Sequence, residues 1–214
     1  MSERILIIGA NGKVGRLTAQ KLKDDLRFEP VAMLRKKEQK AFFDQLGIES
    51  VLGDLSSDVD RLAKLMKGFD AIVFTAGSGG QTGYDQTLAI DLDGAVKTFE
   101  AAEKAGVHRY VMVSAIHADK RDAWEQSGIK PYYIAKHYAD RLLRASSLKY
   151  TILRPARLLD EAGTGKIAAS LLGAKLQIPR EDVASVIVEV LKSDSSQRKI
   201  FDLVSGDVLI DQLL

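Results

Sequence analysis

The N-terminal stretch of the chain combines an apolar run with three regularly spaced glycines. Ile5–Ile8 is unbroken hydrophobic sequence, which is typical of a parallel strand that is buried on both faces. Gly9, Gly12 and Gly15 follow at intervals of three residues, and helical periodicity begins at Val14. Strand, glycine turn and helix in this order predict a cradle for a pyrophosphate group, because N–H groups at the start of a helix attract anions.

The three glycines have separate uses in such a turn. Gly9 allows the chain to turn tightly, Gly12 lets the backbone approach a pyrophosphate, and Gly15 lets the helix pack close to the strand. The alternative, an ordinary turn between a strand and a helix, does not explain three glycines in register. We therefore predict that a dinucleotide binds here. The expected contacts come from the turn itself: Gly9, Asn11, Gly12, Lys13, Val14 and Gly15.

Length and composition restrict the class of protein. The 214 residues predict one domain over positions 1–214, and a hydrophobic share of 46% is enough for a sizeable core. A net charge of +2 predicts neither a nucleic-acid nor a membrane partner, so a small-molecule substrate is the expected partner. The chain has no cysteine and no apolar run near the ~20 residues of a membrane span, and we expect no signal peptide. We expect a cytoplasmic protein.

The last residue of the second predicted strand, 30–35, concerns the choice of cofactor. Arg35 lies about 20 residues after Gly15, where a NAD-binding fold places an acidic residue against the ribose 2′-hydroxyl. A guanidinium group suits a 2′-phosphate instead, which favours NADP, with NAD as the alternative. Lys36 and Lys37 follow, so the competing interpretation is a solvated basic helix start.

Two further strands end in residues that suit a ligand. The predicted strand 49–54 ends at Asp54, which either accepts a hydrogen bond from an adenine amino group or caps the next turn. The predicted strand 69–76 ends in the glycine-rich segment 77–80, which is either part of the ligand site or a flexible loop. The additional candidate cofactor contacts at these strand ends are Leu55, Ala76, Gly77 and Ser78.

The second half of the chain continues the alternation of helices and strands. A long amphipathic helix is predicted from Tyr84 to Lys104, with Leu88 among the side chains that face the sheet. A strand over 109–115 places Ser114 at its end, and the polar segment 117–128 is expected to be a loop. Trp124 in this loop either covers the site or packs locally. The three histidines show no metal-ligand spacing, and no metal site is predicted.

Together these motifs resemble the short-chain dehydrogenase/reductase superfamily, specifically its small atypical members. The matching pieces cover about three quarters of the chain: Gly9-x-x-Gly12-x-x-Gly15, Gly53-Asp54, Ala76-Gly77-Ser78-Gly79, Ser114, Tyr132-x-x-x-Lys136 and Leu153-Arg154-Pro155. The resemblance implies an α/β Rossmann-type doubly wound parallel sheet of about seven strands. It also implies a small substrate cap within about 156–180 and 205–214, and Pro155 as a further cofactor contact.

The resemblance also implies that Ser114, Tyr132 and Lys136 form the catalytic group. Tyr132 and Lys136 are four residues apart on a predicted helix and therefore share a face. The Lys136 ammonium would lower the pKa of the Tyr132 phenol from about 10 towards neutrality, and would bind the nicotinamide ribose. Tyr132 would donate a proton to the substrate oxygen that Ser114 holds. The competing interpretation is an exposed tyrosine beside a solvated lysine.

Three functions fit the sequence. The first is a reductase that uses NADPH to transfer hydride to a small carbonyl, quinone or flavin-like compound. The second is an epimerase or dehydratase with a retained nicotinamide, against which the short region after the sixth strand argues. The third is a non-catalytic NADP(H)-sensing module, which would not need the Ser-Tyr-Lys set. The sequence does not specify the substrate or the oligomeric state.

Overall fold

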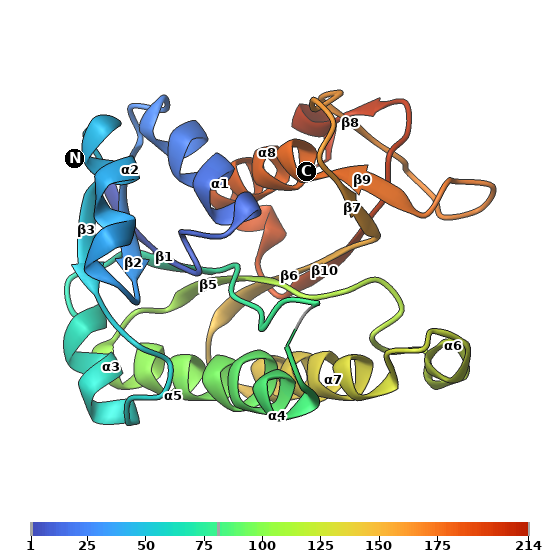
Figure 1. Ribbon diagram of the computed structural model, residues 1–214. Helices are drawn as coiled ribbons and strands as arrows, with labels where there is room; N and C mark the ends of the chain where they lie inside the picture. Colours follow the sequence, from blue (N-terminus) through green and yellow to red (C-terminus); the bar gives the residue numbers. More distant parts are fainter. Residues whose placement is uncertain (1, 81, 214) are drawn as a thin grey trace.

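The chain forms a seven-stranded parallel sheet with helices on both faces, as expected (Figure 1). This computed structural model describes residues 2–80 and 82–213. The strand order is β10-β6-β5-β4-β1-β2-β3, which is the doubly wound Rossmann arrangement. The strands are β1 (Glu3–Ile8), β2 (Phe28–Leu34), β3 (Glu49–Leu52), β4 (Ala71–Phe74), β5 (Arg109–Val113), β6 (Lys149–Pro155) and β10 (Lys199–Leu203).

Two helix layers cover the sheet. One face carries α1 (Lys13–Lys23), η1 (Lys37–Gln39), α2 (Lys40–Gln45) and α8 (Arg180–Leu191). The other carries α3 (Val59–Met66), α4 (Tyr84–Gln86), η2 (Thr87–Gly94), α5 (Ala95–Ala105) and α7 (Lys130–Ala145). Successive β1 side chains pack into opposite layers: Ile5 and Ile7 into one hydrophobic cluster, Leu6 and Ile8 into the other. The unbroken apolar run of β1 is therefore explained by burial on both faces.

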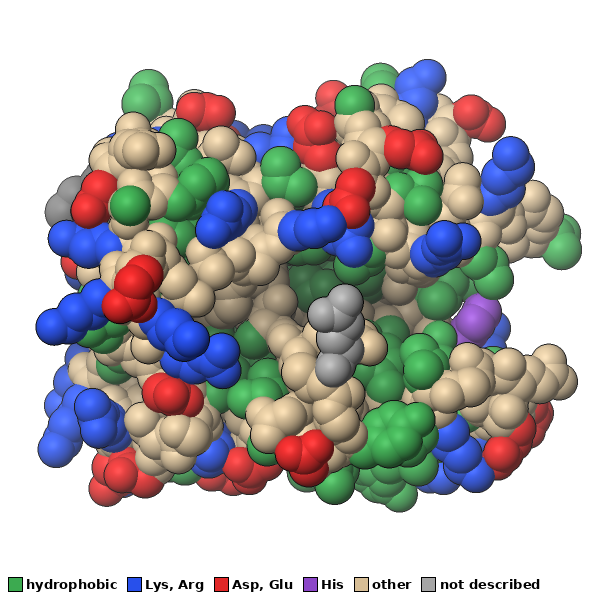
Figure 2. Space-filling view, viewed as in Figure 1, with side chains coloured by type: hydrophobic (Ala, Val, Ile, Leu, Met, Phe, Trp, Pro, Cys, Tyr) green, Lys and Arg blue, Asp and Glu red, His purple; other side chains and the backbone are tan. Residues whose placement is uncertain are grey.

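The chain reverses its winding direction at β1. This strand pairs with β2 on one side and with β4 on the other, so the loops that follow β1 and β4 diverge to opposite helix layers. Ligands of open α/β sheets bind at such a point, beyond the carboxyl ends of the strands. Figure 2 shows a hollow between the two helix layers, with hydrophobic side chains inside it and Lys and Arg side chains on its margin.

The predicted long helix over 84–104 is wound differently from the expectation. Its middle segment, η2, is a π-helix, and α-helical winding resumes only in α5. The wider turn changes which side chains face inward, so Leu88 is 51% exposed and Asp91 is buried instead. The prediction that Leu88 faces the sheet was wrong because it assumed α-helical periodicity throughout.

The polar segment 117–128 is not only a loop, because it contains α6 (Arg121–Gln126). Trp124 in this helix is buried, donates a hydrogen bond to the carbonyl of His117 at 3.0 Å and packs edge-on against His137. Of the two interpretations of this tryptophan, local packing is the one that the structure shows.

Beyond β6 the chain forms small sheets beside α8, at the upper right of Figure 1. β7 (Arg157–Leu159) pairs in parallel with β9 (Gln177–Pro179), and β8 (Lys166–Ile167) pairs antiparallel with β11 (Val208–Leu209). The short helices η3 (Asp194–Ser196) and η4 (Ile210–Gln212) complete this region. Within the described part of the chain, no helix has the length and apolar character needed to cross a membrane.

Candidate active site

The glycine turn after β1 has the close contacts that require glycine. Gly9 has a φ of 81°, and a Cβ atom on it would lie 2.5 Å from the backbone nitrogen of Ala76. A Cβ atom on Gly15 would lie 2.4 Å from the carbonyl oxygen of Gly9, so this residue lets α1 pack against the turn. A Cβ atom on Gly12 would lie 3.2 Å from the same oxygen, a milder contact than at Gly9 or Gly15 but one that still requires a small shift of that carbonyl.

The N-terminus of α1 opens into this turn. Gly12 is the N-cap residue, no described side chain caps the helix, and its first turn contains no acidic residue. The N–H groups and the dipole of the first turn are therefore available to an anion. Arg16, which the sequence did not single out, donates a hydrogen bond to Asn11 Oδ1 at 2.7 Å and lies over the Phe42 ring.

Lys13, a predicted cofactor contact at the start of α1, forms an ion pair with the C-terminal region. Its Nζ lies 2.6 Å from Asp160 Oδ2, and Arg180 Nη1 lies 2.6 Å from the other Asp160 oxygen. These ion pairs join the segment after β7 to the glycine turn. Val14, the next residue of the turn, is buried in the hydrophobic cluster on this side of the sheet.

Arg35 and Asp54 lie beyond the ends of β2 and β3. Arg35 is exposed, and no described carboxylate lies within ion-pair distance of it. Asp54 accepts a hydrogen bond from the Ser56 N–H at 2.8 Å, so the turn-capping interpretation is correct for one of its oxygens. This hydrogen bond, assisted by the Arg35 charge, holds the pKa of Asp54 below its ordinary value. Leu55 is buried in the core beside this turn.

Lys136 on α7 reaches the end of β4 through a buried carboxylate. Its side chain is only 5% exposed, and its Nζ lies 3.0 Å from Oδ1 of Asp91 on η2. The other Asp91 oxygen accepts a hydrogen bond from the Ser78 N–H at 3.0 Å. A Cβ atom on Gly77 would lie 3.2 Å from Asp91 Oδ1, so the same carboxylate lies against the backbone of this glycine. Lys136 is therefore held beside the turn that approaches Gly9.

Tyr132 and Lys136 share a face of α7, as predicted; Lys136 is buried and Tyr132 is half-buried. The Lys136 Nζ lies 5.6 Å from the centre of the Tyr132 ring. Burial raises the pKa of Tyr132 above its ordinary value, and the Lys136 charge offsets this only in part because Asp91 opposes it. Burial alone would lower the pKa of Lys136, but Tyr132 and Asp91 raise it on balance. The prediction that Lys136 brings the Tyr132 pKa towards neutrality was therefore wrong for the free protein.

Ser114 lies beside a second buried ion pair. Its side chain is 3% exposed, and its Oγ has no hydrogen-bond partner with good geometry among the described residues. Burial raises the pKa of the neighbouring Asp140, while the Ser114 hydroxyl and the Arg154 charge act to lower it. Arg154 Nε donates to Asp140 Oδ2 at 2.8 Å, and Arg154 Nη1 lies 2.8 Å from Asp119 Oδ2.

The sequence missed Asp91, Asp140 and Arg154 as members of this buried cluster. Asp140 follows Lys136 by four residues, which is a detectable signal for a shared helix face. The sequence includes Arg154 in a predicted motif but does not predict its ion pairs. It does not predict the burial of Asp91, because that depends on π-helical winding. Pro155, the predicted contact at the end of β6, is buried, and its carbonyl accepts a hydrogen bond from the Ile116 N–H at 3.0 Å.

Comparison with known proteins identifies a family of NAD(P)H-binding proteins. A family model for NAD(P)H-binding proteins matches residues 9–194. The chain belongs to this family. It is 46% identical to an uncharacterized sugar epimerase of Bacillus subtilis, over 99% of this chain and 98% of that protein. The predicted resemblance to small proteins of the short-chain dehydrogenase/reductase type is thereby confirmed.

Solved structures of NAD(P)-binding proteins share the whole fold. A Bacillus halodurans protein described as an NAD-dependent epimerase/dehydratase has a TM-score of 0.90 and 38% identity, covering 99% of this chain and 98% of that chain. The oxidoreductase ylbE of Lactococcus lactis has a TM-score of 0.87 and 33% identity, covering 98% and 94%.

Reductases also occur among the relatives of this NAD(P)H-binding protein. Sanguinarine reductase of Eschscholzia californica is 28% identical over 94% of this chain and 88% of that protein. The anaerobilin reductase ChuY of Escherichia coli has a TM-score of 0.72 and 25% identity, covering 96% and 98%. The chain is therefore a member of an NAD(P)-binding oxidoreductase and epimerase-like family.

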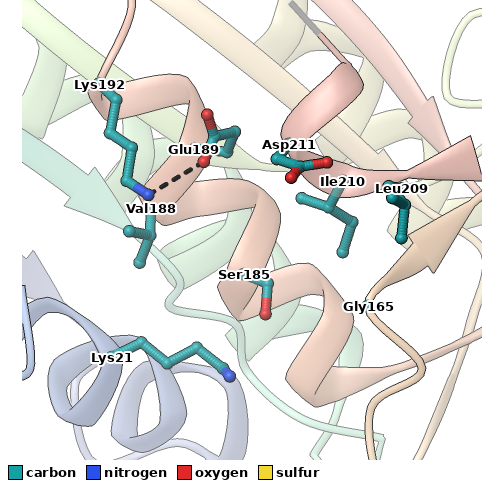
Figure 3. Close-up of a pocket in the computed structure, with 9 residues that line it drawn as sticks. All are labelled: Lys21, Gly165, Ser185, Val188, Glu189, Lys192, Leu209, Ile210 and Asp211. Carbon is teal, nitrogen blue, oxygen red and sulfur yellow. Dashed lines mark hydrogen bonds and ion pairs between the residues drawn. The ribbon is translucent and has the colours of Figure 1, made fainter.

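Two surface cavities of this NAD(P)H-binding chain lie outside the Tyr132–Lys136 region. Figure 3 shows one of about 310 Å³, which lies between α1, α8 and the C-terminal segment and is lined by Lys21, Ser185 and Asp211 among others. None of the predicted site residues lines it. The second, of about 420 Å³, lies beside Lys13 and Arg16 at the start of α1.

The buried Asp140–Arg154 pair yields a stability prediction. Asp140→Ala leaves a buried guanidinium with Asp119 as its remaining partner, so we expect a loss of about 3 kcal/mol in the free energy of unfolding. Asp119→Ala is the matched control: its carboxylate is 52% exposed, so its loss should cost less than about 1 kcal/mol. Urea unfolding of both variants measures the difference. Equal losses would show that Arg154 does not depend on the buried carboxylate.

Proposed function

We propose that this chain is an NADP(H)-dependent reductase that transfers hydride to a small carbonyl, quinone or flavin-like substrate. The observation that carries the proposal is the burial of Lys136 beside Gly77 and Ser78, with Tyr132 one helical turn away. A buried ammonium is costly and is retained where it has a use. Its position next to the glycine turn supports a use at the nicotinamide end of a bound dinucleotide.

The residues around the turn fit an NADP molecule. The uncapped start of α1 would hold the pyrophosphate, with Gly12 leaving room for it. Arg35, without a carboxylate partner among the described residues, would bind the 2′-phosphate. Asp54 retains one carboxylate oxygen for the adenine amino group, and Lys136 would bind the nicotinamide ribose. The bound cofactor supplies the hydride.

The side chains near α7 would carry out the proton transfer to the substrate. Because burial keeps the pKa of Tyr132 raised, the phenol stays protonated at neutral pH and can act as a proton donor. The Lys136 charge stabilises the phenolate that remains after the transfer. Ser114 Oγ, without a well-aligned protein partner in the described structure, would donate a hydrogen bond to the substrate oxygen.

We further propose that the C-terminal segments form a small substrate cap on one NAD(P)-binding domain spanning 1–214. The cap segments are 156–180 and 205–214, which include β7, β8, β9 and β11. The Lys13–Asp160–Arg180 ion pairs support this because they connect the first cap segment to the glycine turn. Such a short cap suits a small substrate better than a sugar nucleotide.

The second candidate function is an epimerase or dehydratase with a retained nicotinamide. It is supported by the descriptions of the Bacillus subtilis and Bacillus halodurans proteins. An epimerase regenerates its cofactor within each cycle, whereas a reductase consumes NADPH in proportion to product. Measuring NADPH oxidation against product for a substrate panel therefore separates the two functions.

The cofactor preference yields a prediction at Arg35. Arg35→Asp should weaken NADPH binding by about 10- to 100-fold, because a charge-assisted hydrogen bond is replaced by repulsion. NADH binding should be unchanged or tighter. Lys37→Asp, a change of equal charge in the same basic run, is the control and should have a much smaller effect. Fluorescence titrations with both cofactors measure these affinities. Tighter binding of NADH than of NADPH to the unmodified protein would contradict the NADP assignment.

The proton-donor role yields a prediction at Tyr132. Tyr132→Phe should reduce turnover of carbonyl substrates by ~10²–10⁴-fold and leave cofactor affinity unchanged, because only the hydroxyl is removed. Tyr133→Phe is the matched control on the adjacent residue and should retain activity. With a flavin or quinone, water can supply the proton, so the Tyr132→Phe loss should be small. Full carbonyl activity in Tyr132→Phe would refute the acid role.

A further inference from the structure

Asp91 is a buried carboxylate that no motif in the sequence identified. It is 1% exposed and lies on η2, where the π-helical winding brings it to the carboxyl end of β4. A carboxylate without solvent is retained only when its charge is compensated and its oxygens are bonded. The Lys136 ammonium compensates the charge and the Ser78 N–H bonds one oxygen, whereas the oxygen that faces Lys136 has no well-aligned hydrogen bond among the described residues.

The two oxygens of Asp91 have different partners. Oδ2 accepts the Ser78 N–H at 3.0 Å, and Oδ1 lies 3.0 Å from the Lys136 ammonium. Gly77 has no side chain to separate the carboxylate from the β4 turn. One side chain therefore connects the predicted cofactor turn on β4 with the proposed catalytic lysine on α7.

The other charged groups near Lys136 cannot replace Asp91. Tyr132 and Asp140 also face it from α7, but Tyr132 raises the pKa of Lys136 only as a phenolate, and the raised pKa of Tyr132 keeps it a neutral phenol at pH 7. Asp140 is paired with Arg154 from β6 at 2.8 Å. Asp91 is consequently the carboxylate that compensates the buried ammonium directly.

We propose that Asp91 is a positioning residue for this site, which keeps Lys136 charged and fixes it against the Ala76–Ser78 turn. The catalytic role of this positioning rests on the proposed function. The ion pair itself, however, is testable without substrate. Asp91 acts through Lys136 and contacts no reacting atom.

The first test is a double-mutant cycle of thermal stability at pH 7. Lys136→Met alone leaves Asp91 buried without its counter-charge and should lower Tm. In an Asp91→Asn background the same substitution removes an uncompensated ammonium and should raise Tm. Asp93→Asn on the same helix, whose exposed carboxylate pairs with Lys97, is the control background and should leave the Lys136→Met effect negative.

The second test is pH dependence. Without Asp91, burial should bring the Lys136 pKa below that of the unfolded chain, so the unfolded state binds more protons and stability rises with pH. The difference in Tm between wild type and Asp91→Asn should therefore be about 2–4 °C smaller at pH 9.5 than at pH 7. In the same variant, NADPH affinity should fall as pH rises, because neutral Lys136 loses its contact to the ribose. Wild type should show neither trend.

The outcomes separate this inference from the proposed function. A sign change in the Tm cycle together with a pH-dependent NADPH affinity supports the inference, whether or not any substrate is reduced. Equal effects of Lys136→Met in both backgrounds would overturn it. A sign change with NADPH affinity independent of pH in Asp91→Asn would also overturn it, since Lys136 would then be charged without Asp91 or remote from the cofactor. Failure to oxidise NADPH with any substrate would instead overturn the proposed function.

Discussion

The close approach of the β1 turn to the β4 turn is the constraint on which the site depends. A Cβ atom on Gly9 would lie 2.5 Å from Ala76 N, so the two backbones can meet only where a side chain is missing. This contact is made possible by the reversal of winding at β1, which pairs with both β2 and β4. It places the open start of α1 next to Gly77 and Ser78, and through them next to Asp91 and Lys136.

The charged side chains below the site form buried ion pairs and are not exposed to solvent. Lys136 is compensated by Asp91, and Asp140 by Arg154, each pair linking α7 to a different element. Because burying charges is expensive, such pairs contribute little net stability, but they fix side chains in one arrangement. Burial keeps Tyr132 a neutral phenol in the free protein, and Asp91 offsets part of the opposing effect of the Lys136 charge.

The sequence predicted the architecture well because its signals are local. The apolar β1 run, the glycine turn and the facing Tyr132 and Lys136 each depend on residues within a few positions. Asp91 could not be found in this way, since its burial results from π-helical winding that α-helical periodicity does not reveal. The pKa of Tyr132 was mispredicted because burial of the phenol, which raises its pKa most, and the opposing charge of Asp91 about 40 residues away both depend on the folded chain. The roles of the predicted site residues remain predictions.

Calorimetric titration of NADPH into wild type and Gly12→Val tests the central claim most directly. Circular dichroism first establishes that the variant is folded: the residue has an ordinary φ of −70°, but a Cβ atom at Gly12 would lie 3.2 Å from the Gly9 carbonyl oxygen, which must shift slightly. The account predicts one NADPH bound per wild-type chain and no measurable binding to Gly12→Val, since the side chain would occupy the space of the pyrophosphate. Equal NADPH affinity in a folded Gly12→Val protein would contradict it.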